Sequence, residues 1–449
     1  MYDSIVIEDR KKPSVTLVNK GFANDAGSAS SSKGMPVLRY IPTSVPCEAS
    51  IMEDIEAGVD GAFEAMVTAL TKPLTAEEES PKPKEIEKPA RIIFKGSLEE
   101  VNRFFYQRGW ADGLPIIPPT EEAVAEMLTG TDLPSDHLLG KLESRLGKAT
   151  IEKIAINAVM AGALPTYMPV LIAGTKLLLE SERGFMGYTT FGFSTGSWAP
   201  FWIINGPVSS EINVNNSSGA LSPGNIANAA IGRAMGLIIK NIGGVRKGVE
   251  DMGVMGNPMK YSMVIAENEE ESPWEPLHVE YGFKREESTI TVSYPQTYLQ
   301  HWPYSADAEG ILRAVIDNIP RGMRYTFIFT PPHAKNLARE GWTKEDIKEF
   351  ISEYARIPGS RFAGKGLGGM WGGLYKGRIP IRDTDSLSMI RDPQFIRVIV
   401  AGGPGAFIAH AAGGGATPGK KQTQKIELPK NWDKLVKKYK NVVPTYAKY

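Results

Sequence analysis

The stretch RYTFIFTPPHAKNLARE, residues 324–340, decides the fold class, because a strand pattern changes to a helix pattern within it. Aromatic and β-branched residues run up to Thr330, which is typical of a buried strand. Pro331 and Pro332 end this strand, and His333 begins the helical stretch HAKNLARE, residues 333–340. The stretch therefore predicts a strand followed directly by a helix that begins near His333.

The same alternation continues on both sides of this stretch. Further strands are predicted at residues 200–205, 261–267, 288–294 and 395–403. Helices are predicted at residues 97–105, 121–129, 150–161, 167–181, 222–244, 307–319 and 343–355. Ser97 and Glu100 form a capping box for the first of these helices, and Ser222 is the expected N-cap of the fifth, which Gly243 ends. We expect one large mixed α/β (or α+β) domain over residues 96–449, with a Gly-rich C-terminal tail.

A smaller lobe is expected over residues 1–74. Strands at 4–8, 14–20 and 36–42 alternate with a helix or turn at 22–34 and a helix in the run 50–72, which is half of a doubly wound sheet. Because two or three strands make a poor independent domain, we expect this incomplete flavodoxin-like sheet to be completed by the rest of the chain or by another subunit. Residues 75–95, rich in Pro, Glu and Lys, are the expected linker. The predicted class is α/β, a truncated doubly wound lobe plus a large domain.

Composition limits the classes of partner. The chain has 449 residues, with 51 Lys and Arg against 51 Asp and Glu, so the basic excess of a nucleic-acid-binding protein is absent. Zero net charge favours self-association, and we expect an oligomer. No apolar run approaches the length of a membrane span, so no membrane partner is expected. A single cysteine permits no internal disulfide, and a cytoplasmic protein is the simplest expectation.

Two residues are candidate reactive groups. His333, at the start of a helix, would have a lowered pKa and could act as a neutral base; the alternative is a packing or capping histidine. Cys47 lies between a strand and a long helix, where a thiolate nucleophile is plausible. A lone cysteine is, however, more often a small buried hydrophobic residue.

The stretch AENEEESPWEPLHVE, residues 266–280, places six glutamates around one histidine. Glu267 follows a predicted strand, and two prolines around Trp274 hold Glu275 and His278 in a rigid turn. Glu267, Glu275 and His278 form a candidate set for a divalent metal. A polar site without metal, in which His278 and Glu275 are catalytic, and a solvated acidic loop are the alternatives.

An Asn-rich turn lies before the helix expected at 222–244, and amides near a helix N-terminus suit an anionic or polar ligand. Alternatively, these amides serve as turn and cap residues. The candidate substrate-binding residues here are Asn213, Asn215, Asn216, Asn225, Asn228 and Arg233.

Glycine-rich pieces complete the candidates. GKGLGG at 364–369 follows no strand, and GGATPGK at 414–420 lacks the Ser or Thr that binds magnesium, so neither predicts a dinucleotide or P-loop nucleotide site. VIVAGGPGAF, residues 398–407, does run from a strand into a Gly-rich loop, which favours a backbone-lined pocket. Arg361 and Lys365 are candidates for binding a carboxylate or phosphate.

Several of these phrases together resemble a known family. KGMPVLRYIPTSVPCEASIMEDIEAGVDGAFEAMVTALTKPLT (33–75) resembles part of the small domain of the selenocysteine-Gly-Ser-Cys family of selenoproteins and their cysteine homologues. SPGNIANAAIGRA (222–234), AENEEESPWEPLHVEYGF (266–283) and HAKNLAREGWTKEDIKEF (333–350) resemble its associated large domain. The small domain is similar to the selenoprotein B subunits of glycine and betaine reductases, which implies thiol or selenol redox chemistry. The motif itself is absent, since this chain has TLVNKGF where it should stand.

Three functions are therefore open. The first is a cytosolic enzyme that acts on a small polar or anionic substrate, with reductase-like or thiol chemistry, at a pocket between the Asn-rich turn, the Glu267–His278 segment and His333. The second is a non-catalytic or half-catalytic subunit of a heteromeric reductase whose redox group is on a partner chain. The third is a metal-dependent lyase or hydrolase.

Overall fold

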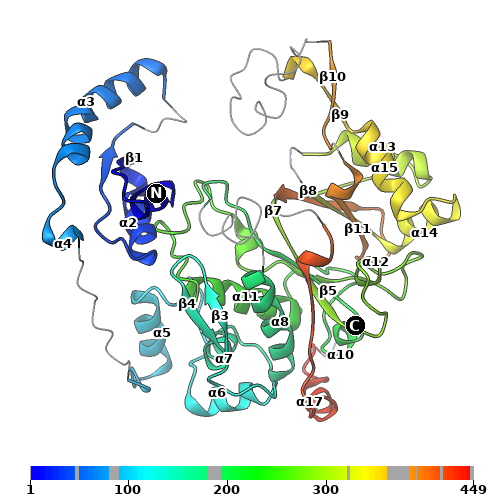
Figure 1. The fold of residues 1–449 in the computed structure, drawn as a ribbon. Helices are drawn as coiled ribbons and strands as arrows, with labels where there is room; N and C mark the ends of the chain where they lie inside the picture. The colour runs from blue at the N-terminus through cyan, green and yellow to red at the C-terminus, as the bar shows by residue number, and fades with distance from the viewer. Residues whose placement is uncertain are drawn as a thin grey trace.

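The computed structural model describes residues 2–45, 50–79, 90–180, 194–320, 324–361, 384–390, 392–414 and 418–444. Helices and a mixed parallel and antiparallel sheet confirm the predicted α/β class (Figure 1). The strands outside the main sheet are β1 (Thr16–Asn19), β2 (Tyr40–Thr43), β3 (Leu138–Leu142), β4 (Gly147–Thr150), β9 (Arg356–Pro358) and β10 (Ser386–Ser388). They form three two-stranded sheets, β1–β2, β3–β4 and β9–β10.

The small lobe contains one β-α-β-α unit. Its helices are α1 (Tyr2–Asp9), α2 (Ala23–Ser32) and α3 (Met52–Thr71). β1 and β2 pair in parallel, and no other described strand joins them, so the rest of the described chain does not complete this sheet. The prediction of a strand at 4–8 is wrong, because those residues lie in the helix α1. The helix is held beside β1 by a hydrogen bond between the hydroxyls of Ser4 and Thr16.

The small lobe contacts the large domain through polar groups. The hydroxyl of Ser28 donates to the carboxylate of Glu250, and Lys33 lies 3.4 Å from Glu143 on the β3–β4 hairpin. Burial, reinforced by the charge of Glu250, raises the pKa of Asp25 to about 6. By contrast, α3 is mostly exposed, and only Ala62 of that helix is buried.

Part of the expected linker lies within the described residues. It contains the short helix α4 (Ala76–Glu79), and residues 80–89 lie outside the described part. Its end is attached to the large domain, because Arg91 pairs with Glu121 and Glu152, and the ring of Phe94 stacks on Phe104 at 4.5 Å.

The main sheet of the large domain has the strand order β11-β8-β12-β7-β5-β6, and β13 also pairs with β7. Its strands are β5 (Phe201–Asn205), β6 (Val264–Ala266), β7 (Thr289–His301), β8 (Arg324–Phe329), β11 (Ile396–Val400), β12 (Ile408–Gly414) and β13 (Thr423–Lys425). Two pairs are parallel, β5 with β6 and β8 with β11. The long strand β7 connects them, because its first half pairs with β5 and β13 and its second half with β12.

Two helix groups cover two separate halves of the sheet (Figure 1). The helices of the large domain are α5 (Leu98–Gln107), α6 (Glu121–Leu128), α7 (Ile151–Met160), α8 (Met168–Glu180), α10 (Val208–Glu211), α11 (Ile226–Asn241), α12 (Leu277–Glu280), α13 (Ala308–Asp317), α14 (Pro331–Arg339), α15 (Lys344–Tyr354) and α17 (Trp432–Tyr439). Helices α7, α8 and α11 pack on β5 and β6, whereas α13, α14 and α15 pack on β8 and β11. The capping box at Ser97 is confirmed, but α11 begins later than expected, because Asn225 and not Ser222 caps it.

The other faces of the two sheet halves pack on each other. Phe201 and Ile265, from β5 and β6, share one core cluster with Ile328 and Ile399, from β8 and β11. At these positions the strands are therefore buried on both faces, as strands between two layers must be. This packing brings together the carboxyl ends of β6, β8 and β11, and the N–H of Asn268 donates to the carbonyl of Val400 at 2.8 Å.

Candidate functional site

The carboxyl ends of these strands form a pocket, the usual place for a ligand in an α/β sheet. Its volume is about 490 Å³, and its floor is the inner sheet face at Ile265, Ile328 and Ala409. The other residues that line it are Ser218, Gly219, Ala220, Leu221, Ser222, Tyr298, Gln300, Thr330, Ala401, Gly402, Gly403, Pro404, Gly405 and Phe407. We call it the Gly-loop pocket, after the loop 401–405. The backbone-lined pocket expected after strand 395–403 is thus present.

The Gly loop needs its glycines for close approach. Gly402 has a φ of +100°, which side-chain-bearing residues rarely adopt, and its N–H donates to the carbonyl of Asn216 at 2.8 Å. A Cβ on Gly403 would lie 2.0 Å from the hydroxyl oxygen of Ser218. The loop therefore packs against the Asn-rich turn and presents backbone, not side chains, to the pocket.

Thr330 is the polar side chain at the junction of β8 and α14. Its position is the N-cap of α14, yet its hydroxyl makes no capping hydrogen bond. Instead, the oxygen lies 3.1 Å from Nδ1 of His333 and donates to the carbonyl of Gly405 at 2.8 Å. Since Pro331 and Pro332 carry no N–H, few backbone donors at this helix start compete for the hydroxyl.

His333 is placed to exchange a proton with this hydroxyl. The imidazole is buried, and burial lowers its pKa, although a backbone hydrogen bond at Phe407 acts in the opposite direction. A neutral ring has one free lone pair and one N–H. In the tautomer with the lone pair on Nδ1, the hydroxyl of Thr330 can donate its proton to His333. In the tautomer with the proton on Nδ1, the ring donates to the hydroxyl oxygen, and the hydroxyl donates to the carbonyl of Gly405. The pair can therefore pass a proton to or from a group in the pocket.

The remaining polar lining is uncharged. Burial raises the pKa of Tyr298, so its phenol stays protonated and can donate a hydrogen bond. Gln300, Ser218 and Ser222 add an amide and two hydroxyls, and none of the described lining residues is a Lys, Arg, Asp or Glu. At the rim, the exposed ring of Trp302 lies 5.4 Å from that of Phe407. This lining suits a small polar molecule with an uncharged body.

A larger hollow of about 840 Å³ lies under the end of the linker, lined by residues 91–96 and by helices α5 and α7. Its walls are mainly apolar, with Phe94, Phe105 and Trp110 among them. Its described lining includes no histidine, and Arg91 and Glu121 in its wall are already paired with each other, so we place the candidate chemistry in the Gly-loop pocket.

The predicted asparagine cluster is mostly structural, contrary to the expected binding role. Asn225 caps α11, and its Nδ2 donates to the carbonyl of Asn213 at 2.8 Å. Asn228 is buried and donates to three carbonyls, while Asn215 bonds within its own turn. The amide of Asn213 donates to Lys440, and Asn216 contributes its backbone carbonyl to the Gly loop. The side-chain amides of the other four asparagines are thus already hydrogen bonded within the wall of the pocket.

Arg233 is not a binding residue of this pocket. Its guanidinium forms two hydrogen bonds with the carboxylate of Asp112, at 2.8 and 3.0 Å, and it also donates to the carbonyl of Pro115. It therefore links α11 to the segment that follows α5. The side chain of Arg233 thus points from α11 toward Asp112 and Pro115, and not toward the Asn-rich turn.

The acidic stretch 266–280 is an ion-pair network. Glu267 is buried and accepts hydrogen bonds from Asn205 at 2.6 Å and from the N–H of Leu277 at 2.7 Å, with Lys344 at 3.4 Å. Glu269 accepts from Gly206 and lies 3.7 Å from the buried ring of His278.

The metal set is not brought together. Glu275 is exposed and paired with Arg285, away from the buried Glu267 and His278. Across the described residues, no group of three or more His, Cys, Asp or Glu side chains is arranged to hold a metal ion. Nor do His278 or Glu275 line the Gly-loop pocket, so the catalytic role predicted for them is not supported. The prolines that fix the turn direct Glu275 to solvent.

Cys47, Lys365 and the stretch 364–369 lie outside the described residues, as does the side chain of Arg361. The sequence-based predictions for them therefore stay predictions. Sequence reasoning overlooked Thr330, although a signal was present: a cap residue followed by two prolines has fewer N–H groups to bond.

A second pair of histidines lies on the opposite face of β12. His301 and His410 are buried, their ring centroids 5.2 Å apart, and none of their four ring nitrogens has a hydrogen-bond partner among the described residues. Burial lowers the pKa of both, and the charge of His301 adds to the effect on His410, whose pKa falls to about 4. Both rings are therefore neutral near pH 7.

Comparison with known proteins adds no relative: no family model, curated protein or solved structure matched the chain. The resemblance to the selenocysteine-Gly-Ser-Cys family stays a prediction. Among the described helices, none has the length and apolarity needed to cross a bilayer.

Proposed function

We propose that this chain is an enzyme that transfers a proton to or from a small polar substrate bound in the Gly-loop pocket. The supporting observation is the hydroxyl of Thr330, which lines the pocket and contacts both His333 and Gly405. Within hydrogen-bond reach of a substrate, a hydroxyl–imidazole pair can act as general acid and base. The uncharged lining favours a substrate that reacts at a carbonyl or hydroxyl group.

The substrate would lie on the inner sheet face and against the Gly loop. There the phenol of Tyr298 and the amide of Gln300 can donate to an oxygen on which negative charge develops. His333 would hold the proton in transit, and its lowered pKa keeps the ring neutral, and so able to accept a proton, at pH 7. We place the enzyme in the cytoplasm, as the single cysteine suggests.

Solvent deuterium exchange tests this proposal even when the product is unidentified. The protein is incubated in D₂O with a panel of small polar aldehydes, ketones and hydroxy-carbonyl compounds, and NMR measures exchange at the carbon beside the carbonyl. Thr330→Val removes the hydroxyl with little change in shape, whereas Thr330→Ser keeps it. We expect Thr330→Val to lower the exchange rate by about 10²-fold or more, with Thr330→Ser near the wild type. Equal rates in wild type and Thr330→Val, or no exchange across the panel, would contradict the proposal.

The hypothesis of reductase-like chemistry adds Cys47 as a thiol that acts on the same substrate. If a thiol step is needed, Cys47→Ser should abolish turnover while leaving deuterium exchange intact. Full turnover by Cys47→Ser would rule out the thiol step and leave the proton-transfer site unaffected. The two parts of the function are thereby tested separately.

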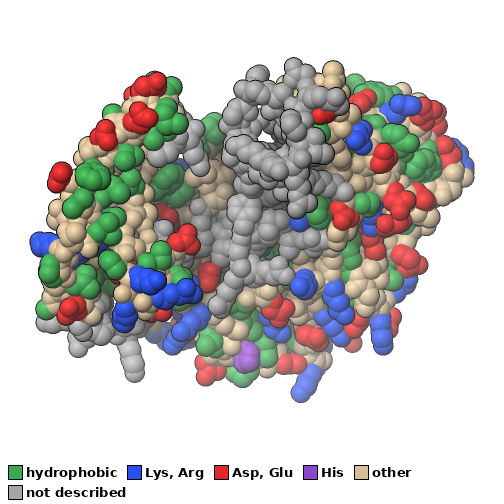
Figure 2. Space-filling view, turned by 45° about the horizontal axis from the view of Figure 1, so that its top comes forward, with side chains coloured by type: hydrophobic (Ala, Val, Ile, Leu, Met, Phe, Trp, Pro, Cys, Tyr) green, Lys and Arg blue, Asp and Glu red, His purple; other side chains and the backbone are tan. Residues whose placement is uncertain are grey.

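An assembly role is the second candidate, favoured by the surface of the small lobe. Along α3 the exposed side chains include Met52 at 63% and Phe63 at 57%, and Ile51 just before it is 65% exposed. Figure 2 shows hydrophobic side chains gathered on this side of the molecule. Such a patch marks an interaction surface. We propose that a second copy or a redox subunit covers it.

Light scattering after size exclusion checks this role. We expect the wild type to elute as an oligomer and Phe63→Glu to have a lower mass, with the neighbouring Glu64→Lys as a matched surface control. A wild type that is monomeric and fully active would leave the patch without a function in self-assembly and would point to a partner chain.

A further inference from the structure

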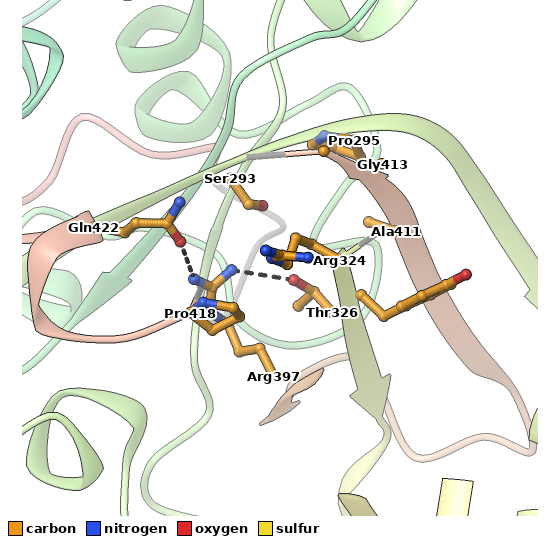
Figure 3. A pocket seen from close by; sticks show the side chains of 11 residues that line it. Ser293, Pro295, Arg324, Thr326, Arg397, Ala411, Gly413, Pro418 and Gln422 are labelled. Carbon is orange, nitrogen blue, oxygen red and sulfur yellow. Dashed lines mark hydrogen bonds between the residues drawn. The ribbon is translucent and has the colours of Figure 1, made fainter. Parts of the chain in front are cut away.

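Two arginines project from the inner sheet face at the ends of β8 and β11 opposite the Gly-loop pocket. Arg397 on β11 pairs with Thr326 in the register, and Arg324 lies two residues before Thr326, so both side chains are on one face. Both line a small cavity together with Ser293, Gln422 and Gly413. Figure 3 shows the two guanidinium groups turned toward the same space. Ile328, which lines the Gly-loop pocket, is four residues after Arg324 on β8. At ~3.3 Å per residue along a strand, the two residues lie ~13 Å apart.

Arg397 is buried with only uncharged partners among the described residues. Its side chain is 2% exposed, and it donates to the hydroxyl of Tyr281 at 3.1 Å, to Thr326 at 3.2 Å and to Oε1 of Gln422 at 3.1 Å. Burial raises the pKa of Tyr281, although Arg397 opposes that shift. The phenol is therefore protonated at neutral pH and supplies no negative charge.

The carboxylates near Tyr281 are already matched by lysines. Glu280 pairs with Lys344 and Lys348, Lys344 also pairs with Glu267, and Lys348 lies 3.8 Å from Glu345. Within the described part of the chain, none of these carboxylates forms an ion pair with Arg397. Residues 415–417, which lie outside the described part, are Gly-Ala-Thr and contain no acid.

A second guanidinium, that of Arg324, also lines the cavity. Arg324 packs over the ring of Phe395 at 3.8 Å, and burial lowers its pKa, while the charge of Asp392 acts in the opposite direction. Arg397 has no ion-pair partner among the described residues. A cation buried in this way is costly, and it normally neutralises, pairs or binds an anion. Arginine does not lose its proton in proteins, which leaves pairing or anion binding.

We propose that the cavity beside Arg397 binds a monatomic anion of the halide class, with chloride as the physiological ligand. The cavity volume is about 10 Å³, room for one water-sized or halide-sized occupant and too little for sulfate or phosphate. Arg397 supplies the charge, and the guanidinium of Arg324 and the hydroxyl of Ser293 also line the cavity wall. This site is independent of the proposed proton-transfer function.

The test compares thermal unfolding in sodium chloride and in sodium gluconate at the same ionic strength. A ligand that binds only the folded state raises the melting temperature in a saturable way. For a chain of this size, we expect a rise of about 3 °C at a chloride concentration one hundred times the Kd. Bromide should act as chloride does, and sulfate should have no such saturable effect.

Gln422→Glu is the decisive variant, because it places a carboxylate where an amide oxygen now lies 3.1 Å from Arg397. This internal anion should make the melting temperature independent of chloride and higher than that of the wild type in gluconate. Arg313→Gln, at an exposed arginine on α13, is the control and should keep the chloride dependence. Equal melting of wild type in the two salts would mean that water alone fills the cavity and would overturn the proposal. An unchanged chloride dependence in Gln422→Glu would place any chloride effect elsewhere.

Discussion

Replacing His410 with leucine should make the fold less sensitive to acid. The folded state depresses the pKa of His410 from its ordinary value of 6.5 to about 4. Between these two values the unfolded chain binds a proton that the folded chain does not. The free energy of unfolding is therefore fully retained above pH 6.5, falls as the pH drops toward 4, and loses nothing further from this group below pH 4.

The depth of burial sets the size of the effect. His410 is fully buried beside His301 and Phe327, so solvent does not screen the cost of charging it. The shift corresponds to a loss of about 2 kcal/mol at pH 5 and about 3 kcal/mol at pH 4 relative to pH 7. His410→Leu removes this loss and fills a similar volume against the neighbouring rings.

Urea unfolding followed by tryptophan fluorescence at pH 7, 6, 5 and 4 measures the difference. The carboxylates contribute to the pH dependence of both proteins, so the informative quantity is the gap between the two curves. We expect that gap to grow in favour of His410→Leu by about 3 kcal/mol between pH 7 and pH 4. His137→Leu, at an exposed histidine, should follow the wild type. Parallel curves for wild type and His410→Leu would refute the assignment.

Two further predictions concern the interior of the large domain. Lys344→Met leaves the buried carboxylate of Glu267 without its cation, 3.4 Å away, and should lower the free energy of unfolding by about 3–5 kcal/mol; adding Glu267→Gln should restore part of it, as urea titration can measure. Gly403→Ala places a Cβ 2.0 Å from the hydroxyl of Ser218, so we expect a loss of about 1–3 kcal/mol and weaker ligand binding. Gly405→Ala, where a Cβ meets nothing within 4 Å, should show neither effect, and equal behaviour of the two alanine variants would contradict the close packing of the loop.

Local signals predicted much of the element order. The capping box at Ser97 places a helix start correctly, because it depends on residues within one helical turn. The helix expected from His333 begins two residues earlier, at Pro331, because proline is accepted in the first helical turn. The strand prediction for residues 4–8 was wrong, because no described strand pairs with these β-branched residues, which lie in α1. β7 runs to His301, well past the expected end at 294, because its second half is held by β12, a strand more than 100 residues later.

The site was harder to predict, because its contacts also join residues that are far apart in the sequence. The Gly loop and the turn at 217–222 were both identified as unusual, but their contact depends on two sheet halves packing face to face. The partner of Glu267 is Lys344, 77 residues away on α15, so the sequence near Glu267 suggested a metal where a lysine supplies the positive charge. Sequence patterns thus identified polar residues but not what neutralises them.

The order of the strands has a consequence for synthesis on the ribosome. β7 and β8 follow each other in the sequence, yet β12 lies between them in the sheet. Until residues 408–414 emerge, a nascent chain holds two apolar strands whose facing edges have no partner. Unpaired edges of this kind recruit other chains, and pairings distant in sequence form slowly. Chaperone demand during translation should therefore be concentrated on the interval between the completion of β7 and the release of β12.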